Sequence, residues 1–265
     1  MFPCLWELAS TQTLWTCLIV AVAAFVQATV GFAAAMFGLP LLLWAGNNLM
    51  ESQVLLVTAM LPQNLFSLWK LRRSIDLREV ALPAAIRTAA LPLGVAGLAV
   101  VMTWPPGTVQ QFVGALILLA LGIQTLVGVE WKSARRPLWM GVVFGSSGFM
   151  QGISGMSAPP MVLWVRAQHF THDRARAFLF AMYISNFIPQ MLLLWWKFGS
   201  PVFHTMAVAL LAVPGVLISA MLGLRLGSRL GDRWMRPSVL VLLLWIGFSS
   251  LLQPWLQTYI LPWLR

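Results

Sequence analysis

The stretch FVQATVGFAAAMFGLPLLLWAG, at residues 25–46, decides the fold of this sequence of 265 residues. It is apolar enough for a membrane, yet small residues and a proline interrupt it where a spanning helix would need an unbroken backbone. A second stretch, FMQGISGMSAPPMVLW at residues 149–164, has the same character. A helix that breaks in lipid frees backbone N–H and C=O groups that lipid cannot satisfy. Because such groups persist where they line a protein cavity, both stretches are candidates for a site.

The composition of the whole chain is that of a membrane protein. Hydrophobic residues make up 60% of the sequence and charged residues only 9%, against about 25% charged in soluble domains. These values exclude a soluble domain, a disordered protein and a coiled coil. We therefore expect an all-α polytopic membrane protein.

The sequence contains eight apolar segments, several of which approach or exceed the roughly 20 residues that cross a bilayer core as a helix. They are residues 14–44, 54–69, 80–102, 109–129, 138–164, 177–196, 202–224 and 239–252. The first and the fifth contain the two interruptions.

The interrupted stretches belong to an internal repeat. Gln27 aligns with Gln151 and Gly31 with Gly155, and the following proline and tryptophan coincide after a gap of four residues. A Pro-Gln pair followed by a lysine then recurs in both halves in the same order. The shared order predicts a duplication.

Basic loops predict how the two halves are oriented. The loops after the second, fourth, fifth and seventh segments hold most of the 17 lysines and arginines, and basic loops face the cytoplasm. If every segment crossed once, the first two loops would face the opposite side from the last two. A re-entrant fifth segment, and by symmetry a re-entrant first segment, removes this conflict; an additional unrecognised crossing is the alternative. Either way we expect two inverted repeats in one membrane domain, residues 1–130 and 131–265, each a broken or re-entrant helix plus three transmembrane helices.

Inverted repeats with paired broken helices are typical of secondary transporters. Half-helix N-termini present N–H groups and a positive dipole end to the cavity, which favours an anion. The predicted substrate-binding residues lie at the two breaks and at polar positions in neighbouring segments: Gln27, Gly31, Ala34, Gln63, Asn64, Arg87, Gln151, Ser154, Gly155, Ser157, Asn186 and Gln190. Structural alternatives are tight helix packing for the small residues, interhelical hydrogen bonds for the amides, and snorkelling to the cytoplasm for Arg87.

Other chemistries find little support in the sequence. All seven acidic residues lie at segment ends or in loops, so a relay of buried carboxylates is not expected. No spacing resembles a metal site and no cofactor is expected. Cys4 and Cys17 are too few for a disulfide framework. The net charge of +10 belongs to loops between apolar runs, so we expect a lipid bilayer and a small anion as partners and no nucleic acid.

An enzyme is the main rival interpretation. Gly152-Ile153-Ser154-Gly155 fits the GxSG motif of rhomboid intramembrane serine proteases, with His204 as a candidate base. The motif is short, the corresponding turn of the first half lacks serine, and His204 lies near a segment end. We therefore expect a transporter and not an enzyme. A purely structural membrane protein is a third alternative, for which the duplicated breaks have no evident use.

The sequence resembles the sulfite exporter TauE/SafE family over about residues 14–252. The resemblance lies in GFAAAMFGLPLLLWAG and GISGMSAPPMVLW, which match the Gly-rich break and following proline of each half, and in LWKLRRSID at 68–76 and DRARAFLF at 173–180. It implies a multi-pass protein of the inner membrane that transports a small anion such as sulfite, an organosulfonate or a similar organic acid. Alanines at 33–35 replace glycines of the family pattern, which indicates a reshaped pocket. Direction of transport, coupling ion and oligomeric state, a homodimer included, stay open.

Overall fold

The structure is a computed structural model, and it describes residues 11–76, 78–126, 137–168 and 170–259. Every regular element in these residues is helical. Among the described residues, six helical spans are long and apolar enough to cross a membrane: Gln12–Thr29, Leu49–Ser74, Arg78–Val101, Pro106–Ile123, Asp173–Phe198 and Pro201–Gly223. The expected all-α polytopic membrane protein is confirmed.

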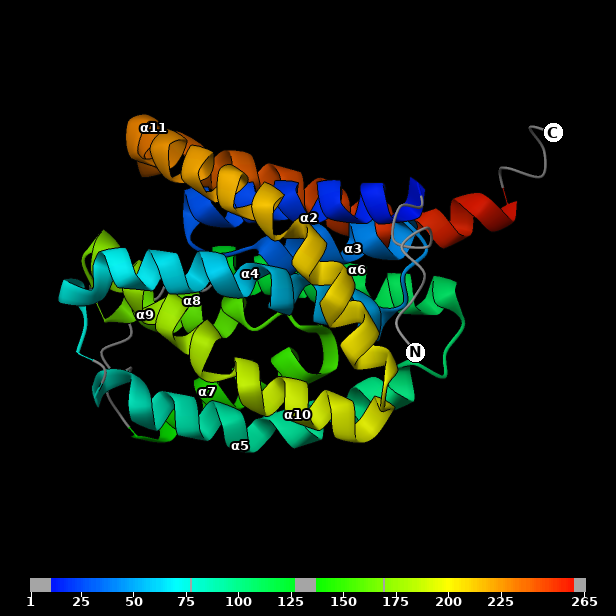
Figure 1. Cartoon of the computed structure of the whole chain (residues 1–265), viewed down its shortest axis with the longest axis horizontal. Helices are drawn as coiled ribbons and strands as arrows, with labels where there is room; N and C mark the ends of the chain where they lie inside the picture. The colour runs from blue at the N-terminus through cyan, green and yellow to red at the C-terminus, as the bar shows by residue number, and fades with distance from the viewer. Residues whose placement is uncertain (1–10, 77, 127–136, 169, 260–265) are drawn as a thin grey trace.

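Figure 1 shows the helices in chain order. They are α2 (Thr11–Val30), α3 (Ala34–Trp44), α4 (Leu49–Leu71), the short 3-10 helix η1 (Arg72–Ser74), α5 (Arg78–Val101), α6 (Pro106–Leu126), α7 (Pro137–Ser154), α8 (Ala158–Ala167), α9 (His172–Ser185), α10 (Phe187–Phe198) and α11 (Pro201–Tyr259). Helix α11 folds back on itself at the left of Figure 1, which separates its two apolar arms, Pro201–Gly223 and Val239–Leu252. These arms correspond to the seventh and eighth predicted segments.

The first broken segment is a helical hairpin of α2 and α3. The chain reverses at Gly31, whose φ of +87° suits glycine and few other residues. Helix α3 then returns along α2. The two helices are in close contact, since a Cβ on Gly38 would lie only 3.1 Å from the Cβ of Ala23. Nearer the open end, the amide of Asn47 donates to the hydroxyl of Thr16 at 3.4 Å. The predicted interruption is therefore a tight reversal.

The second broken segment repeats this design in α7 and α8. Gly155, at φ +72°, turns the chain. The hydroxyl of Ser147 donates to the carbonyl of Ser157 at 2.9 Å across the hairpin. Further along, the rings of Phe144 and Trp164 meet edge to face, with centroids 5.2 Å apart. Both predicted breaks are thus helical hairpins that reverse at a glycine with positive φ.

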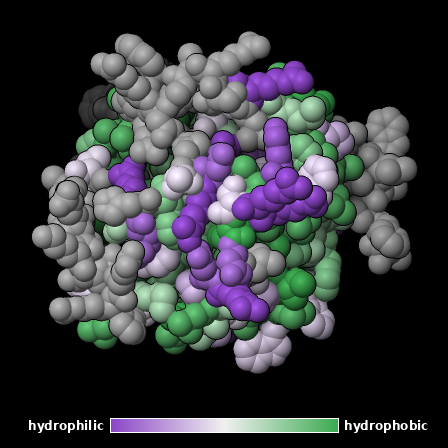
Figure 2. All heavy atoms as spheres, turned by 90° about the vertical axis from the view of Figure 1, so that its left-hand side faces the viewer, coloured by the Kyte–Doolittle hydropathy of each residue, from purple (hydrophilic) through white to green (hydrophobic). Residues whose placement is uncertain are grey.

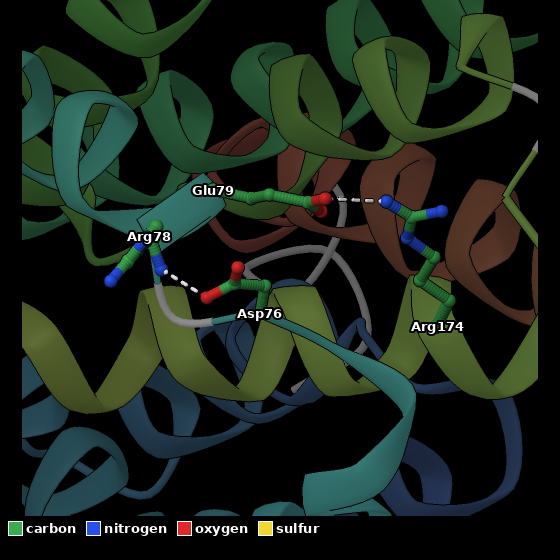
Figure 3. Close-up of polar contacts among 4 residues, drawn as sticks. All are labelled: Asp76, Arg78, Glu79 and Arg174. Atoms are coloured by element: carbon green, nitrogen blue, oxygen red, sulfur yellow. Dashed lines mark hydrogen bonds and ion pairs between the residues drawn. The ribbon is translucent and has the colours of Figure 1, made fainter.

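The two hairpins open toward opposite ends of the molecule. Helix α4 follows α3 and runs to the end where Glu79 of α5 meets Arg174 of α9, with 2.6 Å between Oε1 and Nη2 (Figure 3). Helix α8 leads into α9, so the hairpin of α7 and α8 opens at that same end, while α2 and α3 open at the far end of α4. Opposed hairpins are what an inverted repeat would produce; the duplication itself stays a prediction.

We call the end around Glu79 the basic end, because described lysines and arginines gather there. They are Lys70, Arg72, Arg73, Arg78, Arg166, Arg174 and Arg176. Figure 2 views this end and shows hydrophilic residues across it. The backbone N–H of Arg78 donates to Asp76 at 2.9 Å, where α5 begins (Figure 3). The predicted basic loop at 127–136 lies outside the described residues, and the cytoplasmic location of this end stays a prediction.

The sixth segment differs from the expected continuous run at 177–196. The structure divides it at Asn186, between α9 and α10. Pro189 has no N–H to donate to the carbonyl of Ser185, four residues earlier, so the α-helical ladder loses a bond there. This break has a consequence for the site, described next.

Candidate functional site

A cavity of about 60 Å³ lies between the two hairpins. Its wall includes residues 33–36, where α3 begins, and residues 155–158, where α8 begins. A single water needs about 10–15 Å³ of such space, so the cavity has room for a small ion. Its polar lining consists of Gln27, Asn64, Arg87, Gln151, Ser157 and Tyr183. The remainder of the wall is largely apolar.

Two helix N-termini contribute to this wall. Helix α3 begins after Ala33, and α8 begins after Ser157; neither start has a side-chain cap. Uncapped N–H groups of a first helical turn carry the positive end of the helix dipole and bind anions. Ala33 also adopts a φ of +87°, which is uncommon for a residue with a Cβ. In α8, Pro159 and Pro160 have no N–H to offer, so the backbone N–H groups that favour negative charge in the cavity are mainly those of α3.

Arg87 of α5 supplies the only formal charge among the described residues that line the cavity. Its side chain is fully buried, so the snorkelling alternative is wrong. Nη1 donates to the carbonyl of Met182 at 2.6 Å, and Nη2 donates to Gln151 Oε1 at 3.0 Å and Ser157 Oγ at 2.7 Å. These acceptors are all neutral. Within the described residues, Nε of Arg87 has no hydrogen-bond partner.

The break between α9 and α10 provides one of these acceptors. In an unbroken helix the N–H of Asn186 would bond to the carbonyl of Met182. Here that N–H turns toward the carbonyl of Ile184. The carbonyl of Met182 accepts instead from Arg87 and from the hydroxyl of Ser185 at 3.0 Å, so the break helps to hold the buried guanidinium.

Glycines bring α7 close enough to α5 for Arg87 to reach the second hairpin. A Cβ on Gly152 would lie 2.7 Å from both the carbonyl oxygen of Leu91 and the Cα of Gly94. A Cβ on Gly148 would fall inside the 3.0 Å limit of real contacts, against the carbonyl of Arg87 itself. Gly148 and Gly152 form a G-x-x-x-G pair, the pattern that lets membrane helices pack backbone to backbone.

The two glutamines that the predicted repeat aligns each donate to another side-chain amide. Gln27 Nε2 donates to Asn64 Oδ1 at 2.8 Å in the first half, and Gln151 Nε2 donates to Gln190 Oε1 at 2.6 Å in the second. Only Gln151 also accepts from Arg87. The charge is therefore connected to the second half, and the site is asymmetric.

The cavity wall includes seven of the twelve predicted residues: Gln27, Ala34, Asn64, Arg87, Gln151, Gly155 and Ser157. The other five lie outside it. Gly31 lies beneath the side chain of Arg176, and Gln63 donates to the carbonyl of Ala24 at 3.3 Å. Whether any of the twelve binds a substrate stays a prediction.

The remaining three make local or supporting contacts. Ser154 donates to the carbonyl of Met150, one turn earlier in its own helix, at 3.0 Å. Asn186 accepts from the hydroxyl of Thr88 at 3.0 Å. Gln190 accepts from the side-chain amide of Gln151 at 2.6 Å. The contacts of Asn186 and Gln190 are interhelical hydrogen bonds, which is the alternative considered for the amides.

Several wall residues were not predicted. Tyr183 lines the cavity, with its ring centroid 6.0 Å from the guanidinium carbon of Arg87. It is one of two tyrosines in the chain, and a phenol hydroxyl in an apolar segment could have marked it as a candidate site residue. Met36, Met60 and Met156 also line the cavity, but a methionine in an apolar run carries no such signal.

The geometry of Ser154 does not support the protease alternative. Ser154 is fully buried, and its hydroxyl is directed to the helix backbone. No hydrogen bond between Ser154 and a histidine occurs in the described part of the chain. Among the same residues, no group of three or more His, Cys, Asp or Glu side chains is placed to hold a metal ion.

Comparison with known proteins identifies the family. A family model described as sulfite exporter TauE/SafE matches residues 16–250. No curated protein and no solved structure gave a match. The matched residues include both hairpins, Arg87 and both arms of α11. The chain therefore belongs to the sulfite exporter TauE/SafE family.

Proposed function

We propose that this protein is a secondary transporter of the inner membrane that carries a small anion through the cavity between its two hairpins. Membership of an exporter family and six apolar helices support a multi-pass membrane transporter. The observation that carries the proposal is Arg87, a fully buried cation whose hydrogen bonds end on neutral acceptors.

A buried guanidinium is costly unless a negative group offsets its charge. No carboxylate whose side chain is described does so. Glu51 caps α4, Glu79 pairs with Arg174 and Asp76 bonds to the start of α5. Asp173 is exposed in the first turn of α9. A bound anion would supply the missing charge. The uncapped N-terminus of α3 adds to the same positive field.

Gln151 and Ser157 make the hydrogen bonds to Arg87 that an anion would take over. Both accept from Nη2 of Arg87, and an oxyanion oxygen is a stronger acceptor for a guanidinium than an amide or hydroxyl oxygen. On binding, the anion takes over Nη2, and the freed hydroxyl of Ser157 becomes a donor to it. Alternating access follows when one hairpin and then the other moves away from the cavity.

The wall also favours a particular class of anion. One formal charge balances a monoanion better than a dianion. The apolar side chains of Met36, Met60, Met156 and Leu56 would contact an alkyl group. Short organosulfonates satisfy both conditions, and hydrogen sulfite satisfies the first. We therefore place organosulfonates ahead of doubly charged sulfite, with other singly charged organic acids next.

The test uses purified protein in detergent for calorimetry and in proteoliposomes for uptake. Methanesulfonate is the probe and sulfate is the doubly charged comparison. Arg87→Gln keeps a polar side chain but removes the charge. Losing one partner of a buried charge pair costs about 2–5 kcal/mol, so we expect affinity to fall at least about 30-fold.

Arg73→Gln is the matched control, because Arg73 is an exposed arginine of the basic end. It should bind like the unmodified protein. Arg87→Lys retains charge but not the forked geometry, and it should bind with intermediate affinity. Thermal unfolding of each variant checks folding. Methanesulfonate affinity in Arg87→Gln equal to that of Arg73→Gln would refute the proposal.

A further inference from the structure

In each half of the molecule, one side chain is hydrogen-bonded to the reversal of the other half's hairpin, which we call the tip of that hairpin. In the first half, Gln53 of α4 is fully buried. Its Nε2 donates to the carbonyl of Gln151 at 2.7 Å and to that of Gly152 at 3.3 Å. Both carbonyls belong to the last turn of α7, where intrahelical donors run out; the carbonyl of Gln151 also accepts from the N–H of Gly155 at 2.9 Å. Gln53 therefore caps the second hairpin at its reversal.

In the second half, Arg176 of α9 does the same for the first hairpin. Its Nη2 donates to the carbonyl of Ala28 at 2.9 Å, in the last turn of α2. A cation at a helix C-terminus also interacts favourably with the helix dipole. The Cγ of Arg176 lies directly over Gly31, 3.2 Å from the position of a Cβ, much as Gln53 covers Gly155 at 2.9 Å.

The two capping residues occupy equivalent positions. Helix α4 begins at Leu49 and α9 at His172, so Gln53 and Arg176 are each the fifth residue of the helix that follows their own half's hairpin. Each lies about 6 Å inside its helix, at 1.5 Å per residue. Because α9 begins at the basic end and α4 begins at the other end, the two caps lie toward opposite ends of the molecule.

The cavity lies between the two caps. Along α4 its wall runs from Leu56 to Asn64, which begins one turn inward of Gln53. Along α9 and α10 it includes Tyr183 and Phe187, about two turns inward of Arg176. Both caps are made in this structure.

We propose that Gln53 and Arg176 are positioning residues for transport, each closing the cavity toward its own end. Release of the first hairpin's tip from Arg176 would open the cavity toward the basic end. Release of the second hairpin's tip from Gln53 would open it toward the opposite end. The inference rests on the alternating access of the proposed function, but it assumes nothing about the substrate.

A nearby ion pair gives a useful contrast. Glu79 and Arg174 also join the two halves at the basic end (Figure 3), but their side chains are 38% and 40% exposed. Exposed ion pairs contribute little because water competes for both charges. Arg174, two residues from Arg176 on the same helix, is therefore a matched control.

The experiment measures access to the cavity from each side of a vesicle. Cys4 and Cys17 are first replaced by serine, and Ala35→Cys places a reporter in the cavity wall. A charged, membrane-impermeant thiol reagent is applied to vesicles of either orientation. A separate Arg73→Cys reporter, exposed at the basic end, identifies which face of the vesicle is which.

Arg176→Met keeps the apolar stem and removes the donor, and Gln53→Met does so with nearly unchanged shape. Loss of a buried partner should raise labelling about tenfold, from the basic end in Arg176→Met and from the opposite end in Gln53→Met. Arg176→Lys restores a donor and should restore slow labelling. Arg174→Met should label like the parent.

Three outcomes overturn the proposal: no change, faster labelling from the same end in both variants, or faster labelling from both ends in either one. Gln53→Asn, too short to reach the carbonyls, repeats the test if Gln53→Met does not fold. Failure of both Gln53 variants to fold would make Gln53 a folding residue and also reject the pair. Faster labelling from opposite ends in the two variants, in a protein that does not bind methanesulfonate, would support the capping roles of Gln53 and Arg176 and reject the proposed substrate.

Discussion

Replacing Gly152 by alanine tests the contact that brings the second hairpin to Arg87. An added Cβ would lie 2.7 Å from the backbone of α5, about 0.7 Å short of an ordinary contact of 3.4 Å. The atoms it meets are the carbonyl oxygen of Leu91 and the Cα of Gly94, which belong to the backbone and cannot rotate away. The helices α5 and α7 must therefore separate.

Gly145→Ala is the matched control, because it lies two turns earlier in α7 and its added Cβ would meet no atom within 4 Å. Both substitutions gain the helix propensity of alanine over glycine, about 0.8–1.0 kcal/mol. Gly152→Ala also incurs the cost of overpacking, typically about 1–3 kcal/mol. At about 3 °C per kcal/mol for a chain of this size, Tm should be about 3–9 °C lower in Gly152→Ala than in Gly145→Ala.

Thermal unfolding in detergent, followed by tryptophan fluorescence, measures this difference. Methanesulfonate binding provides a second readout, since separation of α5 from α7 moves Arg87 away from Gln151. We expect weaker binding in Gly152→Ala and unchanged binding in Gly145→Ala. Equal Tm values for the two variants would refute the close helix contact and the account of how Arg87 is positioned.

Three further predictions follow from the same geometry. Gln151→Ala should weaken methanesulfonate binding by about 1–3 kcal/mol, the usual cost of an unmet buried hydrogen bond; calorimetry measures it, and unchanged affinity would move the anion elsewhere. Cysteines placed at Arg72 and at Arg174 should label from the same side of the membrane, because both lie at the basic end; labelling from opposite sides would contradict the topology. Glu79→Gln should retain methanesulfonate uptake within about twofold, since it removes an exposed ion pair, whereas complete loss with normal protein levels would show that a carboxylate is needed.

The sequence by itself determined the class of protein and the positions of the two breaks. Long apolar runs leave helix as the spanning structure, because lipid offers no hydrogen bonds to the backbone. Gly31 and Gly155 were identifiable because reversals need residues that tolerate positive φ, and both have it here. Family motifs are local strings of residues, so they too were legible before any fold was known.

The tertiary structure alone decided which polar groups meet. Arg87 reaches Met182 and Ser157, which are 95 and 70 residues away in the chain, and no periodicity encodes contacts of that range. Ser154 and Ser157 looked alike in sequence, yet one turns to its own helix and the other to the guanidinium. Gln53 and Arg176 were not singled out for the same reason. Their partners are backbone carbonyls of the opposite half. Every residue possesses a carbonyl, and only the fold shows which carbonyls near a helix end are within reach of a distant side chain.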